Sequence, residues 1–138
     1  MNNDHYIGAE WIRVDLHLHS PAVSTFNLPS GINLNSKKVK DNIIAEYIQK
    51  LQEANIKVAA ITDYNGIRSQ WFIPIRDAAE EKEIFILPGA ELSISLSGGK
   101  YGLHLIAIFE DTIDIDGINT FFRSLDKNPQ NPLLEGRK

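Results

Sequence analysis

The feature that most constrains this chain is a short, unbroken apolar stretch near its middle. It reads Val58-Ala-Ala-Ile-Thr and is followed at once by Asp63 and a turn-forming Asn-Gly pair. A strand that is apolar on both faces must be covered on both faces, which is typical of a parallel sheet. We therefore expect strands that alternate with covering helices.

The flanking segments fit this alternation. The expected elements are a strand at 11–17, a helix at 39–54, a strand at 58–62, a helix at 68–82, a strand at 84–92 and a helix at 118–125. Asn35 or Ser36 is the expected N-cap of the first helix. Pro74 is expected to interrupt the second helix near its start, because proline lacks an N–H and clashes with the preceding turn.

A hairpin is expected after the third strand. Ser97-Gly-Gly-Lys100 has the composition of a tight turn between the apolar stretches 92–96 and 101–109, the second of which is the fourth expected strand. A turn centred on Gly98 and Gly99 places Ser93 opposite His104, with Glu91 diagonally nearby on the same face. A shift of one residue in this register would turn His104 away.

Alternating strands and helices leave two architectures, an open doubly wound sheet and a (β/α) barrel. Both place functional residues at the C-terminal ends of strands. Four strands and three helices in 138 residues are too few to close an eight-stranded barrel, which takes about 250 residues. If the fold is a barrel, it is therefore incomplete here, with one domain at 1–126 and a loop or tail at 127–138.

Composition excludes several kinds of site and partner. The chain has no cysteine, so any metal must be held by His, Asp or Glu. With 14 basic and 18 acidic residues, the chain lacks the excess of positive charge that is typical of proteins that bind a nucleic-acid phosphate backbone. No apolar run approaches the roughly 18 residues of a membrane span, and the first residues lack a secretion signal. We expect a cytoplasmic protein without a membrane partner.

Two histidines mark the end of the first expected strand. His17 and His19 are two residues apart, so strand geometry points both imidazoles to one face. Two paired nitrogen donors favour metal ligation over core packing. The same period places Asp15 on that face, where we interpret it as a hydrogen-bond partner rather than a ligand.

The next two strands end in carboxylates, to which we assign the candidate catalytic roles. Glu91 lies at the end of an apolar strand, where a buried charge needs a partner such as a cation. Asp63 precedes Asn-Gly, so a turn former or helix N-cap is its structural alternative. The candidate metal ligands suit Zn, Mn or Fe and are His17, His19, Asp63, Glu91 and His104.

Four motifs occur in the order and spacing of the PHP (polymerase and histidinol phosphatase) domain: Asp15-Leu-His-Leu-His-Ser20, Ile61-Thr-Asp63, Pro88-Gly-Ala-Glu-Leu-Ser93 and His104-Leu-Ile-Ala-Ile-Phe109. The chain resembles that family over about residues 10–110. This resemblance implies the N-terminal portion of a distorted (β/α)7 barrel that hydrolyses phosphomonoesters or phosphodiesters with divalent ions. It also implies that His17 and His19 hold a first ion, Glu91 bridges two, and His104 holds the second.

Two departures from the family pattern bear on the ion count. Tyr64 stands where the family's second motif has a histidine, and Thr25 stands where some members supply another. We therefore expect two ions rather than three. Tyr64, Asn65 and Ser20 are expected to line a substrate pocket, although packing beneath the rim is the alternative for Tyr64.

The opening Glu10-Trp-Ile-Arg-Val-Asp-Leu-His-Leu-His-Ser-Pro-Ala22 and Thr62-Asp-Tyr-Asn65 also resemble the N-terminal PHP part of TrlF-like proteins. That narrower resemblance implies an ATPase region in the same polypeptide and a nucleotide or nucleic-acid substrate. The family's later motifs, a His-Pro strand end and an Asp-x-His, are absent, so this chain alone is expected to be nearly inactive. A catalytically incomplete PHP module and a metal-dependent amidohydrolase remain open alternatives.

Overall fold

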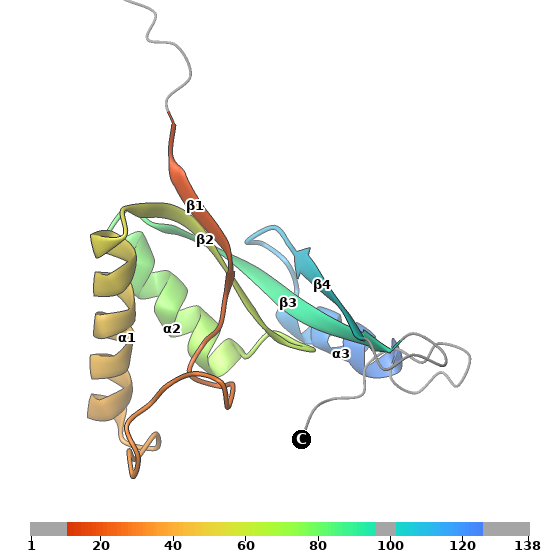
Figure 1. Cartoon of the computed structure of the whole chain (residues 1–138), viewed down its shortest axis with the longest axis horizontal. Coiled ribbons are helices and arrows are strands. Elements are labelled where there is room, and N and C mark those ends of the chain that lie inside the picture. The colour runs from red at the N-terminus through yellow and green to blue at the C-terminus, as the bar shows by residue number, and fades with distance from the viewer. Residues whose placement is uncertain (1–10, 96–101, 126–138) are drawn as a thin grey trace, which may run out of the picture.

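The computed structural model describes residues 11–95 and 102–125. The elements, in chain order, are β1 (Arg13–Leu18), α1 (Lys37–Glu53), β2 (Ile56–Tyr64), α2 (Ser69–Glu80), β3 (Phe85–Ser95), β4 (Gly102–Ile108) and α3 (Ile115–Leu125). The strands form one sheet in the order β1-β2-β3-β4. The first three strands are parallel and β4 is antiparallel to β3. Figure 1 shows a curled sheet with helices beside it, an α/β fold that corresponds to part of a barrel.

Helices α1 and α2 supply most of the core on one face of the sheet (Figure 1). The buried residues of α1 recur at helical spacing and are Ile44, Tyr47, Ile48 and Leu51. They pack in one cluster with Ala59 and Ile61 of β2 and with Phe72 and Ile75 of α2. The apolar residues at helical spacing thus form the face through which α1 packs into the core.

Pro74 lies inside α2 and does not interrupt it, so this expectation is wrong. The missing N–H removes one hydrogen bond of the helix. However, Trp71, Phe72 and Ile75 are all buried in the core beside it. Burial of these large side chains favours the continuous helix more than the proline disfavours it.

The pairing of β1 with β2 contains an irregularity. Asp15 lies opposite Ala59 and Leu18 lies opposite Ile61, with a register shift between them. Three steps along β1 therefore match two along β2, so Asp15 shares a sheet face with Leu18, which packs against the helical core. The expectation that Asp15 shares the face of the two histidines is corrected accordingly.

The expected hairpin register is confirmed. Ser93 lies opposite His104, and Glu91 lies opposite Ile106. Because β4 runs against the other strands, its beginning lies at the edge where β1, β2 and β3 end. The turn predicted at Gly98 and Gly99 lies outside the described residues, as does the predicted tail at 127–138.

Gly89 allows β3 to lie close to both of its neighbours. A Cβ atom at this position would lie 2.8 Å from the backbone oxygen of Ala107 and 2.8 Å from Cγ2 of Thr62. Such contacts are too short for any side chain, so the close approach requires glycine. This approach fixes the strand that carries Glu91.

Helix α3 is tied to the loop after β2. The side chain of Asn119 accepts a hydrogen bond from the N–H of Ile67 and donates one to its carbonyl oxygen, both at 2.9 Å. Ile115 and Ile118 pack against the core from the same helix. Among the described residues, no helix has both the length and the apolar character needed to cross a membrane.

Candidate metal centre

The carboxylate of Glu91 is the centre of a cluster of histidines. It is buried, with only 3% of its side chain exposed. Its Oε2 atom lies 2.9 Å from Nε2 of His17 and 3.3 Å from Nε2 of His19, while its Oε1 atom contacts Nδ1 of His104. Three imidazoles from β1, the loop after it and β4 therefore meet at one carboxylate from β3.

The atoms of this cluster fit a divalent cation. One donor atom from each of His17, His19 and Glu91 lies within 4.8 Å of the others. Imidazole nitrogen with carboxylate oxygen is a donor set suited to Zn, Mn or Fe. Nδ1 of His19 is also buried and has no hydrogen-bond partner among the described residues. This nitrogen lies toward Asp63, whereas Nε2 of the same ring faces Glu91, so Nε2 is the atom that His19 offers to an ion at the cluster.

The cluster is closed on one side and accessible on the other. The side chains of His17 and His104 are 51% and 45% exposed, whereas that of His19 is 22% exposed. The rings of His17 and His19 meet edge to face, with centroids 5.3 Å apart. The buried carboxylate of Glu91 thus lies at the closed side of the cluster, and a ligand from solvent can approach the exposed side chains of His17 and His104.

Asp63 lies behind His19 and is held by Ser20. Its Oδ1 atom is 4.0 Å from Nδ1 of His19. Oδ1 accepts a hydrogen bond from the backbone N–H of Ser20 at 2.7 Å, and Oδ2 accepts one from its hydroxyl at 2.6 Å. Ser20 is fully buried. The structure therefore gives Ser20 a supporting role for Asp63 instead of the expected place in an open substrate pocket.

Tyr64 packs against one of the candidate ligands. The centroid of its ring lies 4.7 Å from that of His19, with the two planes tilted by 41°. This contact favours the packing alternative, in which the phenol ring limits the movement of the imidazole.

Asn65 holds the backbone on both sides of Glu91 through two hydrogen bonds. Its N–H donates to the carbonyl oxygen of Glu91 at 2.9 Å, and its side-chain oxygen accepts from the N–H of Ser93 at 3.1 Å. Its φ angle is 54°, a left-handed conformation that asparagine adopts more readily than most residues. The side chain is thus engaged with β3, although the sequence predicts it in the substrate pocket.

Tyr47 supports the loop that carries His19, a role that the sequence pattern of α1 does not indicate. Its hydroxyl donates a hydrogen bond to the backbone oxygen of His19 at 3.2 Å. Burial, together with the carboxylates of Asp63 and Asp15, raises the pKa of Tyr47 well above its ordinary value. The phenol therefore stays protonated and can donate. The available signal was a tyrosine on an apolar face, since a buried phenol usually finds a polar partner.

The fold is similar to those of two solved structures. An amidohydrolase from Chromobacterium violaceum, solved with bound sulfate and no metal, has a TM-score of 0.53 and 20% identity over 81% of this chain and 32% of its own. A candidate metal-dependent phosphoesterase from Bifidobacterium adolescentis has a TM-score of 0.51 and 16% identity, with the same two coverages of 81% and 32%. The chain thus spans about a third of the length of each protein.

No family model and no curated protein sequence gives a significant match to the chain. The two structural similarities, at their low sequence identities, establish the fold alone. Together with the curled four-stranded sheet, they show that this chain has the architecture of a partial (β/α) barrel.

Proposed function

We propose that this chain forms the ion-binding part of a PHP-type, metal-dependent phosphoesterase. The observation that carries the proposal is the buried carboxylate of Glu91 in contact with three histidines. Because its two oxygens lie beside different imidazoles, Glu91 with His17 and His19 would hold one ion, and Glu91 with His104 would hold a second. The motif order of the sequence supports this reading, as does the structural neighbour described as a candidate metal-dependent phosphoesterase.

Divalent ions at such a centre supply positive charge for phosphate oxygens and lower the pKa of water toward neutrality. The chain's own residues provide the rigid frame that this chemistry needs. Asn65 fixes the backbone at Glu91, and Tyr47 fixes the backbone at His19. In this proposal Glu91 is a catalytic residue through its contact with the ions, and Asp63 is a positioning residue behind His19.

The donor set supports Zn, Mn or Fe as the ion. The resemblance to the PHP family, with tyrosine at position 64 in place of a histidine, supports two ions in the complete site. The narrower resemblance to TrlF-like proteins extends the proposal to a longer polypeptide, in which an ATPase region accompanies this domain. In that setting the substrate is a nucleotide or a nucleic acid.

Metal binding is the first test of the proposal. Calorimetric titration of the metal-free chain with Zn²⁺ and Mn²⁺ should show saturable binding, with metal analysis giving up to two ions per chain. Glu91→Gln should abolish this binding, because it removes the negative charge at the centre of the cluster. His5→Ala is the matched control, since His5 belongs to none of the motifs and its loss should leave binding unchanged. Absence of saturable binding to the unmodified chain would overturn the proposal.

A second candidate is a metal-dependent amidohydrolase, because one structural neighbour carries that description. The two functions are separated by assays on the longest native polypeptide that contains this chain, loaded with metal. Hydrolysis of p-nitrophenyl phosphate or its diester, with no release from p-nitroacetanilide, supports the phosphoesterase. The reverse result supports the amidohydrolase, and ion binding without either activity supports a catalytically incomplete module.

A further inference from the structure

Arg68 follows the end of β2, the strand that carries Asp63 and Tyr64. It is the N-cap residue of α2, and its side chain is exposed. The side chain nevertheless folds back onto the end of β2, where Nη2 donates a hydrogen bond to the carbonyl oxygen of Tyr64 at 3.2 Å. Nη1 lies beside Gly66, 3.4 Å from the position that a Cβ atom would take there. Contacts with the backbone therefore place the guanidinium.

The direction of one peptide group relates this guanidinium to Glu91. The N–H of Asn65 donates to the carbonyl oxygen of Glu91 on β3 at 2.9 Å. The carbonyl oxygen of the same peptide group, which belongs to Tyr64, accepts from Arg68. In a trans peptide these two groups point in opposite directions, so Arg68 lies on the β1 side of β2. The bond lengths of a single peptide group limit the distance from Nη2 to the carbonyl oxygen of Glu91 to no more than about 9 Å.

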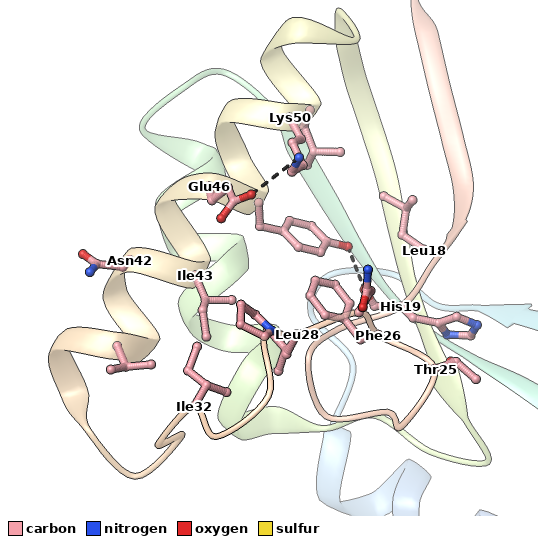
Figure 2. Close-up of a pocket in the computed structure, with 15 residues that line it drawn as sticks. Leu18, His19, Thr25, Phe26, Leu28, Ile32, Asn42, Ile43, Glu46 and Lys50 are labelled. Atoms are coloured by element: carbon pink, nitrogen blue, oxygen red, sulfur yellow. Dashed lines mark hydrogen bonds and ion pairs between the residues drawn. The ribbon is translucent and has the colours of Figure 1, made fainter.

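His19 follows β1 directly, on that same side of β2. Figure 2 shows its imidazole turned away from α1. The centroid of this ring lies 4.7 Å from that of Tyr64, and its Nε2 atom lies 3.3 Å from the carboxylate of Glu91. Tyr64 therefore contacts a candidate ion ligand through its ring and Arg68 through its carbonyl oxygen.

The loop at 65–68 is held by the elements on either side of it. The side-chain oxygen of Asn65 accepts a hydrogen bond from Ser93 of β3 at 3.1 Å. The side chain of Asn119 on α3 binds both backbone groups of Ile67, which is buried. Because the backbone that leads to Arg68 is already fixed, a ligand loses little affinity to the ordering of this loop.

Arg68 has no acidic partner among the described residues. On the same helix, the guanidinium of Arg76 is paired with Asp77 at 2.9 Å. A guanidinium has five N–H groups, and the structure shows one hydrogen bond from that of Arg68 to the described residues. Two N–H groups of a guanidinium match two oxygens of a phosphate in distance and direction. The remaining donors of Arg68 are thus available to an anion near the Glu91 cluster.

We propose that Arg68 is a substrate-binding residue of this centre, and that its guanidinium holds oxygens of a phosphate group. The inference rests on the proposed function, in which ions at Glu91 bind the reacting phosphate. The group that Arg68 holds is either the reacting phosphate itself or the next phosphate along a nucleic-acid strand. Both offer the same charged oxygens to a guanidinium.

The test measures the binding of two probes, methylphosphonate and tetrathymidylate, to the Mn²⁺-loaded chain by calorimetry. Arg68→Gln should weaken the binding of at least one probe by about tenfold, because a charge-assisted contact is lost. Arg68→Lys keeps the positive charge and should recover part of that loss. Arg76→Gln is the matched control farther along α2, and it should bind both probes as the parent does. The Mn²⁺ affinity of each variant should remain close to that of the parent.

The two probes distinguish the two phosphate positions. Weaker binding of both probes by Arg68→Gln assigns Arg68 to the reacting phosphate, and weaker binding of tetrathymidylate alone assigns it to the neighbouring one. In either case the slope of log binding constant against log salt concentration should flatten by about 0.7 for tetrathymidylate, a change that a structural role would not cause.

The failure of this proposal differs from the failure of the proposed function. If Arg68→Gln binds both probes as Arg76→Gln does, or if the Mn²⁺-loaded parent binds neither probe, the role given to Arg68 is wrong and the ion centre stands. Absence of Mn²⁺ binding to the parent would instead overturn the proposed function, and the role of Arg68 with it.

Discussion

Ser20 donates two hydrogen bonds to the carboxylate of Asp63, one from its backbone N–H at 2.7 Å and one from its hydroxyl at 2.6 Å. The pair joins the loop after β1 to the end of β2. Both residues are buried, at 0% and 1% exposure, so solvent cannot replace either bond. This carboxylate therefore helps to fix the position of the loop that follows His19, together with the hydrogen bond from Tyr47.

Ser20→Ala should lower the free energy of unfolding by about 1 to 3 kcal/mol, because Oδ2 of buried Asp63 loses its donor. Urea denaturation followed by circular dichroism measures the change. Ser24→Ala, on an exposed position of the same loop, should change stability by less than about 0.5 kcal/mol. Equal stabilities of the two variants would contradict the role given to the Ser20 hydroxyl.

The raised pKa of Tyr47 predicts that the free energy of unfolding falls at alkaline pH. Its pKa is raised in the folded chain above the ordinary value of about 10, so the folded state keeps a proton that the unfolded state loses. The stabilisation linked to the protonated phenol of Tyr47 is fully present below about pH 10, and it is lost as the pH rises toward the folded-state pKa. The free energy of unfolding should fall by about 1.4 kcal/mol per pH unit in that window from this group alone.

Tyr47→Phe isolates this contribution, because the other titrating groups are common to both proteins. The difference in stability between the parent and the variant should be constant below pH 9 and should shrink above pH 10. Guanidinium denaturation at several pH values measures it. A difference that stays constant up to pH 11 would show that the phenol has an ordinary pKa.

Gly89→Ala should destabilise the sheet by about 1 to 3 kcal/mol, because the new methyl group meets Ala107 and Thr62 at 2.8 Å. Gly117→Ala is the control. Its Cβ would meet the side chain of Asp114, which can rotate away, and alanine favours the helix. Thermal unfolding should show a lower melting temperature for the first variant and an unchanged or higher one for the second.

Tyr64→Phe should leave metal affinity within about twofold of the parent, since the ring that packs on His19 remains. Tyr64→Ala removes that ring and should weaken binding by about three- to tenfold. Phe121→Ala, on the exposed face of α3, controls for the loss of an aromatic side chain. A large loss of affinity in Tyr64→Phe would instead assign a direct role to the hydroxyl.

The sequence predicts those parts of the fold and site that follow from a regular spacing of residues within one segment. Helical spacing locates α1, and the hairpin pattern gives the pairing of Ser93 with His104. Interactions between distant segments leave no such pattern. Tyr47 meets the backbone of His19 across 28 positions, and Asn119 meets Ile67 across 52.

Two departures show how tertiary structure overrides local preference. Pro74 is a helix breaker by its own chemistry, but buried neighbours keep α2 continuous. Asp15 follows the period of its strand in the sequence, but the shifted pairing with β2 moves it to the other face. In both cases the deciding contact comes from a segment that the local pattern does not contain.

The antiparallel direction of β4 determines how His104 reaches the cluster. Among the described strands, β4 pairs only with β3, and one of its faces carries His104 and Ile106 on the side of Glu91. β1 likewise pairs only with β2, so the imidazoles of His17 and His104 come from the two opposite edges of the described sheet. Ions held at Glu91 would therefore link the first and last strands of that sheet.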